Sequence, residues 1–191
     1  MSELGGWYTQ QIDIVADGLR RHFSHVVADV EASEVTGFGV ISDPTDFTLT
    51  PAVNTRQNLA QHMREFVEAG LGDAQEAAAE CMWNPGEWAF IGRGSGGSPA
   101  LVELASFAKE AQRRTLESGD RQLGVMMFFE CIVRALVVLF EEGFFDEFGQ
   151  AVQVFDVVDL DFTDAPFDRW MAGINTQAAY DSYQKYVALN S

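Results

Sequence analysis

The sequence predicts one α+β domain, in which several helices cover a small, mainly antiparallel sheet of about four strands, with long helices at both termini. Apolar residues recur three or four positions apart over long segments at each end of the chain, which is the helical period. Short segments of strand composition form an early group and return late, without the regular strand–helix alternation of a doubly wound fold. No repeat and no Pro- or Ser-rich linker divides residues 1–191, and 47% of them are hydrophobic, so a single packed domain is expected.

The N-terminal part of the chain predicts a helix followed by a hairpin. The helix covers residues 7–30, where the apolar side chains share one face. Residues 36–42 (TGFGVIS) have the composition of a strand, residues 43–46 have turn chemistry, and residues 47–50 alternate as a second strand. Pro51 then ends the predicted hairpin.

Several of the later elements start at residues with capping chemistry. Asn54 or Thr55 caps a helix that reaches about Val67, and Asp73 opens a second helical piece that ends near Trp83. Further along, the pattern predicts a strand at 87–91, a helix at 99–118 with Ser98 as its cap and Pro99 at its first position, a helix at 121–142, a strand at 152–160, and a last helix at 165–189 with Asp164 as its cap.

The most apolar stretch, residues 125–140, is expected to be a core helix. It is sixteen residues long, below the ~20 needed to cross a bilayer, and it contains Glu130 and Arg134 at a spacing that lets a helix pair them. Only two cysteines occur, Cys81 and Cys131, both in apolar surroundings, and no signal peptide is evident at the N-terminus. A cytoplasmic protein without a membrane partner is the expectation.

Charge is the strongest clue to a partner. The chain has 29 acidic and 12 basic residues, a formal net charge of −17, and no Lys or Arg lies between Arg134 and Arg169. A surface of this kind attracts a basic protein and disfavours nucleic acid and anionic membranes. The predicted partner-binding residues are seven carboxylates and two candidate aromatic anchors, of which at least one also fits the core: Glu141, Glu142, Phe144, Phe145, Asp146, Glu147, Asp156, Asp159 and Asp161.

Two further segments allow both a functional and a purely structural interpretation. The loop at 92–97 (GRGSGG) matches a glycine-rich phosphate loop, but the charge opposes an anionic ligand and the next helix leads into another helix. As a general acid or base the first candidate is Glu87, because Trp83 and Trp88 flank it and their burial would raise its pKa. For the loop, a mobile surface segment is the preferred interpretation. For Glu87, the structural packing of an aromatic hairpin is preferred.

Metal sites are not favoured. His22, His25 and Asp29 offer nitrogen and oxygen ligands from one helix, but a solvated polar face is the preferred interpretation. The acidic run 156–164 lacks the glycine and terminal glutamate of a calcium loop. The chain has no G-x-S-x-G elbow and no Walker loop, so whether it is an enzyme stays open, with a non-enzyme favoured and no cofactor expected.

Two segments together carry a family resemblance. Residues 51–55 (PAVNT) are followed some thirty residues later by residues 83–90 (WNPGEWAF), and this order resembles the bacterial domain-of-unknown-function family 4303. The resemblance covers roughly residues 35–160 and implies an α+β fold but no established activity. Small acidic domains of this sort are often encoded beside toxins, which suggests an immunity protein.

The sequence therefore leads to two main functional hypotheses, and a structural subunit or adaptor, which shares the charge argument, is a third possibility. The first is an immunity protein that neutralises a basic toxin domain by occluding it. The alternative is a small enzyme or nucleotide-responsive domain that uses the loop at 92–97.

Overall fold

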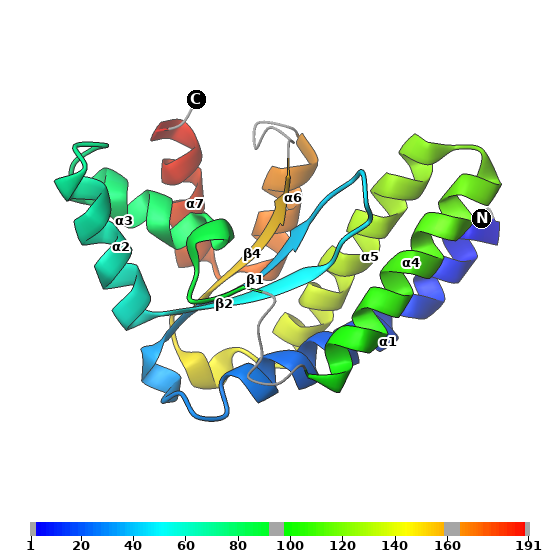
Figure 1. Cartoon of the computed structure of the whole chain (residues 1–191), viewed down its shortest axis with the longest axis horizontal. Helices are drawn as coiled ribbons and strands as arrows, with labels where there is room; N and C mark the ends of the chain where they lie inside the picture. Colours follow the sequence, from blue (N-terminus) through cyan, green and yellow to red (C-terminus); the bar gives the residue numbers. More distant parts are fainter. Residues whose placement is uncertain (1–2, 92–97, 159–164, 190–191) are drawn as a thin grey trace.

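The computed structural model describes residues 3–91, 98–158 and 165–189, and it confirms the α+β class (Figure 1). One four-stranded sheet has the order β3-β2-β1-β4, in which β1–β2 and β2–β3 pair antiparallel and β1–β4 pair parallel. The strands are β1 (Val35–Ser42), β2 (Thr50–Thr55), β3 (Phe90–Ile91) and β4 (Val152–Val157). The helices are α1 (Glu3–Val26), α2 (Arg56–Glu68), α3 (Ala74–Trp83), α4 (Pro99–Ser118), α5 (Arg121–Glu141), α6 (Ala165–Ile174) and α7 (Gln177–Leu189), with short 3-10 helices η1 (Ala32–Glu34), η2 (Pro85–Glu87) and η3 (Asp146–Phe148).

The sheet lies between two groups of helices. On one face, Phe38 of β1 contacts Phe23 of α1 with ring centroids 5.1 Å apart, and Phe155 of β4 contacts Phe129 of α5 at 5.7 Å. On the other face β1 carries only glycines at 37 and 39, and the indole of Trp88 lies directly against them. Successive side chains of a strand point to opposite faces, so Phe38 lies on one face of β1 and the two glycines lie on the other.

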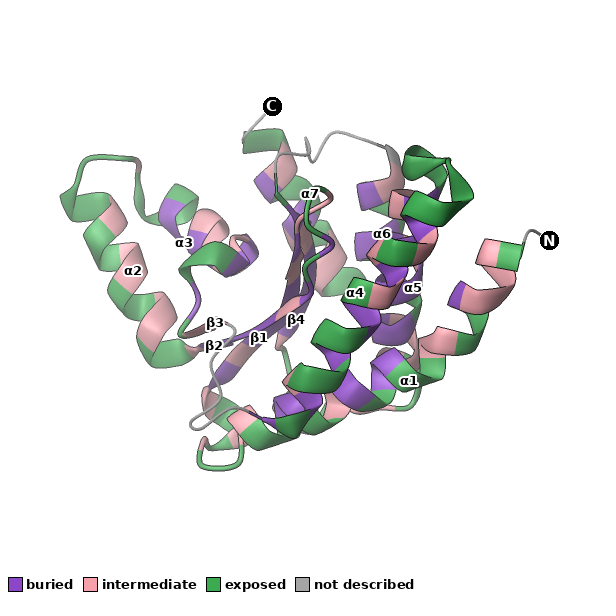
Figure 2. Cartoon of the chain, turned by 45° about the vertical axis from the view of Figure 1, so that its right-hand side comes forward, coloured by how far each residue is buried: buried purple, intermediate pink, exposed green. Residues whose placement is uncertain are grey.

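Helix α5 supplies the centre of the core. Its buried residues include Phe128, Phe129, Ile132, Leu136 and Leu139, and it contacts α1, α4 and α6. By length and composition it is the one helix among the described residues that could span a membrane, yet its apolar side chains lie against the neighbouring helices. Figure 2 shows the buried positions concentrated along the sheet and α5, while α2 is exposed over most of its surface. The prediction of a core helix here is confirmed.

The early hairpin is confirmed, but its second strand is displaced. Strand β2 begins at Thr50, so the prediction of a strand at 47–50 is wrong, and Pro51 lies inside β2 opposite Val40 instead of ending the hairpin. Among the described residues, strand β3 pairs with Ala52 and Val53. Phe47 instead turns inward within the connection, at φ 52° and with 3% of its surface exposed.

Most helix starts agree with the predicted caps. The Thr55 hydroxyl accepts a hydrogen bond from the amide of Asn58, and Asp73 forms a capping box with Glu76. Ser98 caps α4 through the amide of Ala100. The predicted C-terminal helix is divided into α6 and α7 at residues 175–176, β3 and β4 are shorter than expected, and Asp164 lies outside the described residues.

Candidate functional site

The central part of the predicted acidic surface is the turn that joins α5 to β4. Helix α5 ends at Glu141, Gly143 just after it has φ 74°, and the amide of Phe144 donates to the carbonyl of Leu139 at 3.0 Å. Glycine is favoured here because an L side chain is strained in this left-handed conformation. We call residues 141–149 the acidic turn.

Three predicted carboxylates of the acidic turn are available to a partner. Glu141, Asp146 and Glu147 are exposed, and none of the ion pairs among the described residues involves them. Glu142 is exposed too, but it forms a salt bridge with Arg20 of α1. A basic partner would therefore have to compete with Arg20 for Glu142. It could bind the other three carboxylates without displacing a described ion pair.

The aromatic anchors predicted beside these carboxylates belong largely to the core. Phe145 has 5% of its surface exposed and its ring centroid is 5.1 Å from that of Phe38, so the prediction that it contacts a partner is wrong. Phe144 is half-buried, with its ring 5.1 Å from Phe145 and 6.0 Å from Phe38. The turn folds back on the sheet because burying these rings removes a large apolar surface from water.

The carboxylates of β4 do not extend the acidic turn. Asp156 is half-buried in the strand, and burial raises the pKa of its carboxyl group, an effect opposed by a hydrogen bond from the Val157 backbone. It therefore does not belong to an exposed rim, which corrects the prediction. Asp159 and Asp161 lie outside the described residues.

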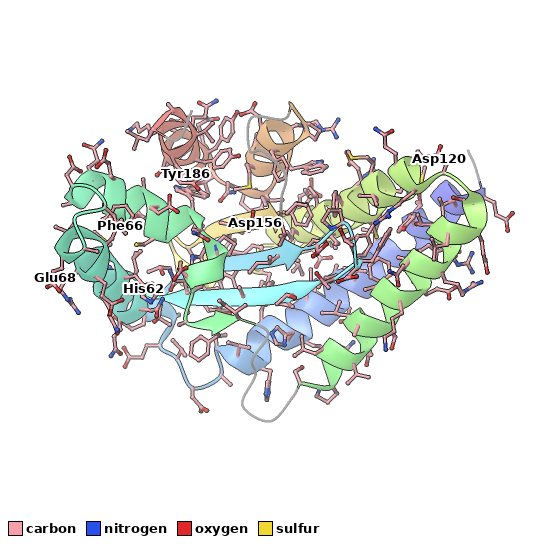
Figure 3. The ribbon with its side chains drawn as sticks, turned by 45° about the horizontal axis from the view of Figure 1, so that its top comes forward. His62, Phe66, Glu68, Asp120, Asp156 and Tyr186 are labelled. Carbon is pink, nitrogen blue, oxygen red and sulfur yellow. The ribbon has the colours of Figure 1, made fainter. Side chains whose placement is uncertain are left out.

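A second acidic surface, not predicted from the sequence, lies between α2, α3 and η2. It is a cavity of about 430 Å³, and the described residues of its lining include Glu65, Glu80 and Glu87 together with the apolar side chains Phe66 and Leu71, and no Lys or Arg. We call it the α2–α3 acidic pocket. Figure 3 shows His62 and Phe66, which both line it, on α2 and well away from Asp156 on the sheet.

The electrostatics of this pocket confirm that its carboxylates converge. Burial raises the pKa of the Cys81 thiol, and Glu80, Glu87 and Glu65 raise it further. Cys81 is therefore a neutral thiol at pH 7 and not an activated nucleophile. Two helices joined by a short glycine-containing corner bring these residues together. All three carboxylates lie in a run without Lys or Arg, residues 65–92, but their convergence in one pocket depends on the packing of α2 against α3.

Glu87 does not have the environment expected of a catalytic acid or base. Its side chain is 60% exposed, and Nδ1 of His62 lies 3.6 Å from its Oε2. The flanking rings of Trp83 and Trp88 are buried in the core and leave the carboxylate in water. The expected desolvation is therefore absent.

The structure also corrects the interpretation of the histidine candidates for a metal site. His22 is 1% exposed with Nδ1 unpartnered, so the prediction that it lies on a solvated face is wrong, and α1 ends before Asp29. Burial, with a smaller contribution from His25, lowers the pKa of His22 to about 4. No group of three metal-ligating side chains occurs in residues 3–91, 98–158 and 165–189.

The glycine loop at 92–97 lies outside the described residues. Its flanking elements are as the sequence predicted, because β3 is antiparallel to β2 and α4 leads into α5. That context differs from the strand–helix–strand unit of dinucleotide-binding folds.

Comparison with known proteins adds no relative: no protein-family model, no curated protein and no solved structure matches the chain. The resemblance to domain-of-unknown-function family 4303 stays a prediction.

Proposed function

We propose that this chain is an acidic protein-binding domain of the cytoplasm that neutralises a basic bacterial toxin domain by covering it. The observation that carries the proposal is the set of exposed carboxylates with no cationic partner, in a chain of net charge −17. Charge of one sign in excess repels itself within the folded domain, so a surface that keeps it is suited to meeting the opposite sign. Small acidic domains of this sort are often encoded beside toxins, and this association supports the same class of protein.

The acidic turn is suited to steering the approach. Glu141, Asp146 and Glu147 are exposed, and exposed charges mainly raise the association rate and add little to final affinity. The turn offers no exposed apolar anchor, because its aromatic rings face the sheet. Tight binding therefore requires a second contact.

The α2–α3 acidic pocket supplies what the turn lacks. Leu71 lines this pocket and is 68% exposed, and the carboxylates of Glu65 and Glu80 line the same pocket. An apolar centre with charged groups around it is the arrangement in which binding energy concentrates. In our proposal an Arg or Lys of the toxin enters this pocket while the acidic turn orients the rest of the basic surface.

The test is capture from the native host's lysate at low and at high salt, with bound proteins identified by mass spectrometry. We expect a basic protein that is released by salt and whose toxic activity is lost in the complex. Two variants then locate the contact: a turn variant (Glu141→Lys, Asp146→Lys and Glu147→Lys) and a pocket variant (Glu65→Lys with Leu71→Ala).

The matched control reverses three exposed carboxylates elsewhere, Asp13→Lys, Asp29→Lys and Glu31→Lys. Each substitution adds two charges, so the turn variant and the control both change the net charge from −17 to −11. We expect the turn variant to slow association, the pocket variant to speed dissociation, and the control to retain binding. Equal losses of partner affinity in the turn variant and the control would mean that net charge, and not the acidic turn, determines binding. The absence of any basic partner would contradict the proposal.

A further inference from the structure

One large cavity has a net positive lining among the described residues, opposite in sign to the charge of the whole chain. It has a volume of about 730 Å³ and lies between α1, α5 and α6. Two arginines, Arg134 of α5 and Arg169 of α6, line it, and Glu130 is the one carboxylate among the lining residues that the structure describes. These three groups together carry a formal charge of +1, in a chain of −17.

The free positive charge belongs to Arg134. Glu130 was expected to pair with Arg134 one helical turn away, but it pairs with Arg169, and the indole N–H of Trp170 donates to the same oxygen at 3.2 Å. Arg134 is exposed and forms no ion pair with any described residue. Its guanidinium is thus available to a ligand, with donors placed to bind a carboxylate through two parallel hydrogen bonds.

The rest of the cavity wall is apolar and uncharged. Ile12 and Met127 contribute aliphatic surface beside the ring of Tyr8 and the thiol of Cys131. The Tyr8 hydroxyl lies 3.3 Å from the Gly124 carbonyl, to which it donates, and 3.4 Å from the Thr115 hydroxyl, so the phenol is turned away from a ligand. Burial raises the pKa of both Tyr8 and Cys131 to about 12, so neither group adds negative charge at pH 7.

We propose that this cavity binds an amphipathic monocarboxylate, with the carboxylate on Arg134 and the hydrocarbon chain against Tyr8, Ile12 and Met127. The volume is within the range of small-molecule sites, about 300–1,000 Å³. A single unpaired guanidinium matches one negative charge, and the surrounding acidic surface disfavours ligands with more. The inference is independent of the toxin-binding proposal, since the site uses other residues and the opposite charge.

The experiment is calorimetric titration of the full chain with three probes of equal chain length below their micellar concentrations: decanoate, decanol and decyltrimethylammonium. We expect decanoate to bind saturably, decanol about tenfold more weakly, and the cation not to bind at this site. A tenfold difference corresponds to about 1.4 kcal/mol, of the order expected for a hydrogen-bonded charge contact.

Two variants assign the binding to this cavity. Arg134→Gln should lower the affinity for decanoate to that for decanol and leave the affinity for decanol unchanged. Arg121 is an exposed arginine at the start of the same helix, and Arg121→Gln should leave both affinities unchanged. Thr9→Trp places a bulky ring at an exposed position of the lining and should block both probes. The proposal is overturned if no probe saturates, if decanoate and decanol bind equally, or if Arg134→Gln and Thr9→Trp bind decanoate like the wild type.

Discussion

At the scale of single residues, Trp88 shows how the double-tryptophan segment maintains the fold. Its indole is 4% exposed and lies on the glycine strip of β1, where a Cβ built on Gly37 would be 2.7 Å from Cη2 of the ring. A glycine at this position is required because the ring occupies the space of a side chain. The motif that suggested a family is therefore explained by packing alone.

Replacing Trp88 by alanine should lower the free energy of unfolding by about 3–5 kcal/mol, because a large buried ring is lost and the glycine strip beneath it cannot fill the cavity. Urea denaturation followed by circular dichroism measures the change. Leu71→Ala is the matched control, since Leu71 is 68% exposed and its loss should stay within about 0.5 kcal/mol. Equal stability of the Trp88 variant and the wild type would rule out the core role.

The buried histidine predicts a pH dependence of stability. His22 is 1% exposed, and its pKa in the folded chain is about 4, below the ordinary value of 6.5. The unfolded chain therefore binds a proton at a pH where the folded chain does not. The contribution of His22 to stability is complete above pH 6.5 and is lost as the pH falls toward 4.

Between pH 7 and pH 5 this loss should reach about 2 kcal/mol, and His22→Leu should remove it. Because the acidic surface also titrates, the informative quantity is the difference between the pH profiles of wild type and variant in urea denaturation. His25→Leu, at an exposed position on the same helix, should keep most of the wild-type profile, because burial is the larger cause of the lowered pKa of His22. Parallel profiles for wild type and His22→Leu would contradict the assignment.

At the scale of elements, the side chain of Asn175 closes the outer edge of β4. The amide of Gln153 donates to Asn175 Oδ1 at 2.9 Å, and Nδ2 donates to the carbonyl of Gln153 at 2.7 Å. Strand β4 is at the end of the sheet, so this side chain provides the hydrogen bonds that another strand would make. The break between α6 and α7 places Asn175 at this position.

Replacing Asn175 by leucine should destabilise the fold by about 2–4 kcal/mol, because the buried N–H and C=O of Gln153 both lose a partner. Urea denaturation gives the size of the effect, and hydrogen exchange gives its location, since the Gln153 amide should lose protection first. Gln177→Ala, which removes an exposed side chain bonded only to Asp181, serves as the control and should leave both measurements unchanged.

The elements that sequence reasoning placed correctly are those with a local cause. Thr55, Asp73 and Ser98 start helices through their own side chains, and the apolar period of α5 needs no partner to be recognised. The displaced strand β2 has a non-local cause, because Phe47 is held inside by Phe128, 81 positions away in the chain. Such contacts are invisible in a local pattern.

At the scale of the whole molecule, charge was predictable but its arrangement was not. The base-free run from residue 135 to 168 located the acidic turn, because neighbours in sequence stay neighbours in a turn. The α2–α3 acidic pocket combines residues from α2, α3 and η2. The positive charge of the cavity between α1, α5 and α6 arises because Glu130 pairs with Arg169 and not with Arg134. Both follow only from tertiary packing.

The net charge predicts that salt acts with opposite sign on folding and on partner binding. Raising the salt concentration to about 1 M shortens the Debye length to ~3 Å and screens the repulsion among surplus carboxylates, so the melting temperature of the free chain should rise. The same screening should weaken the complex with a basic partner. Differential scanning calorimetry of the free chain measures the first effect, and the turn variant, with a charge of −11, should show a smaller rise. A melting temperature that is independent of salt would mean that the surplus carboxylates do not strain the fold, and the physical argument for a charged partner would lose its basis.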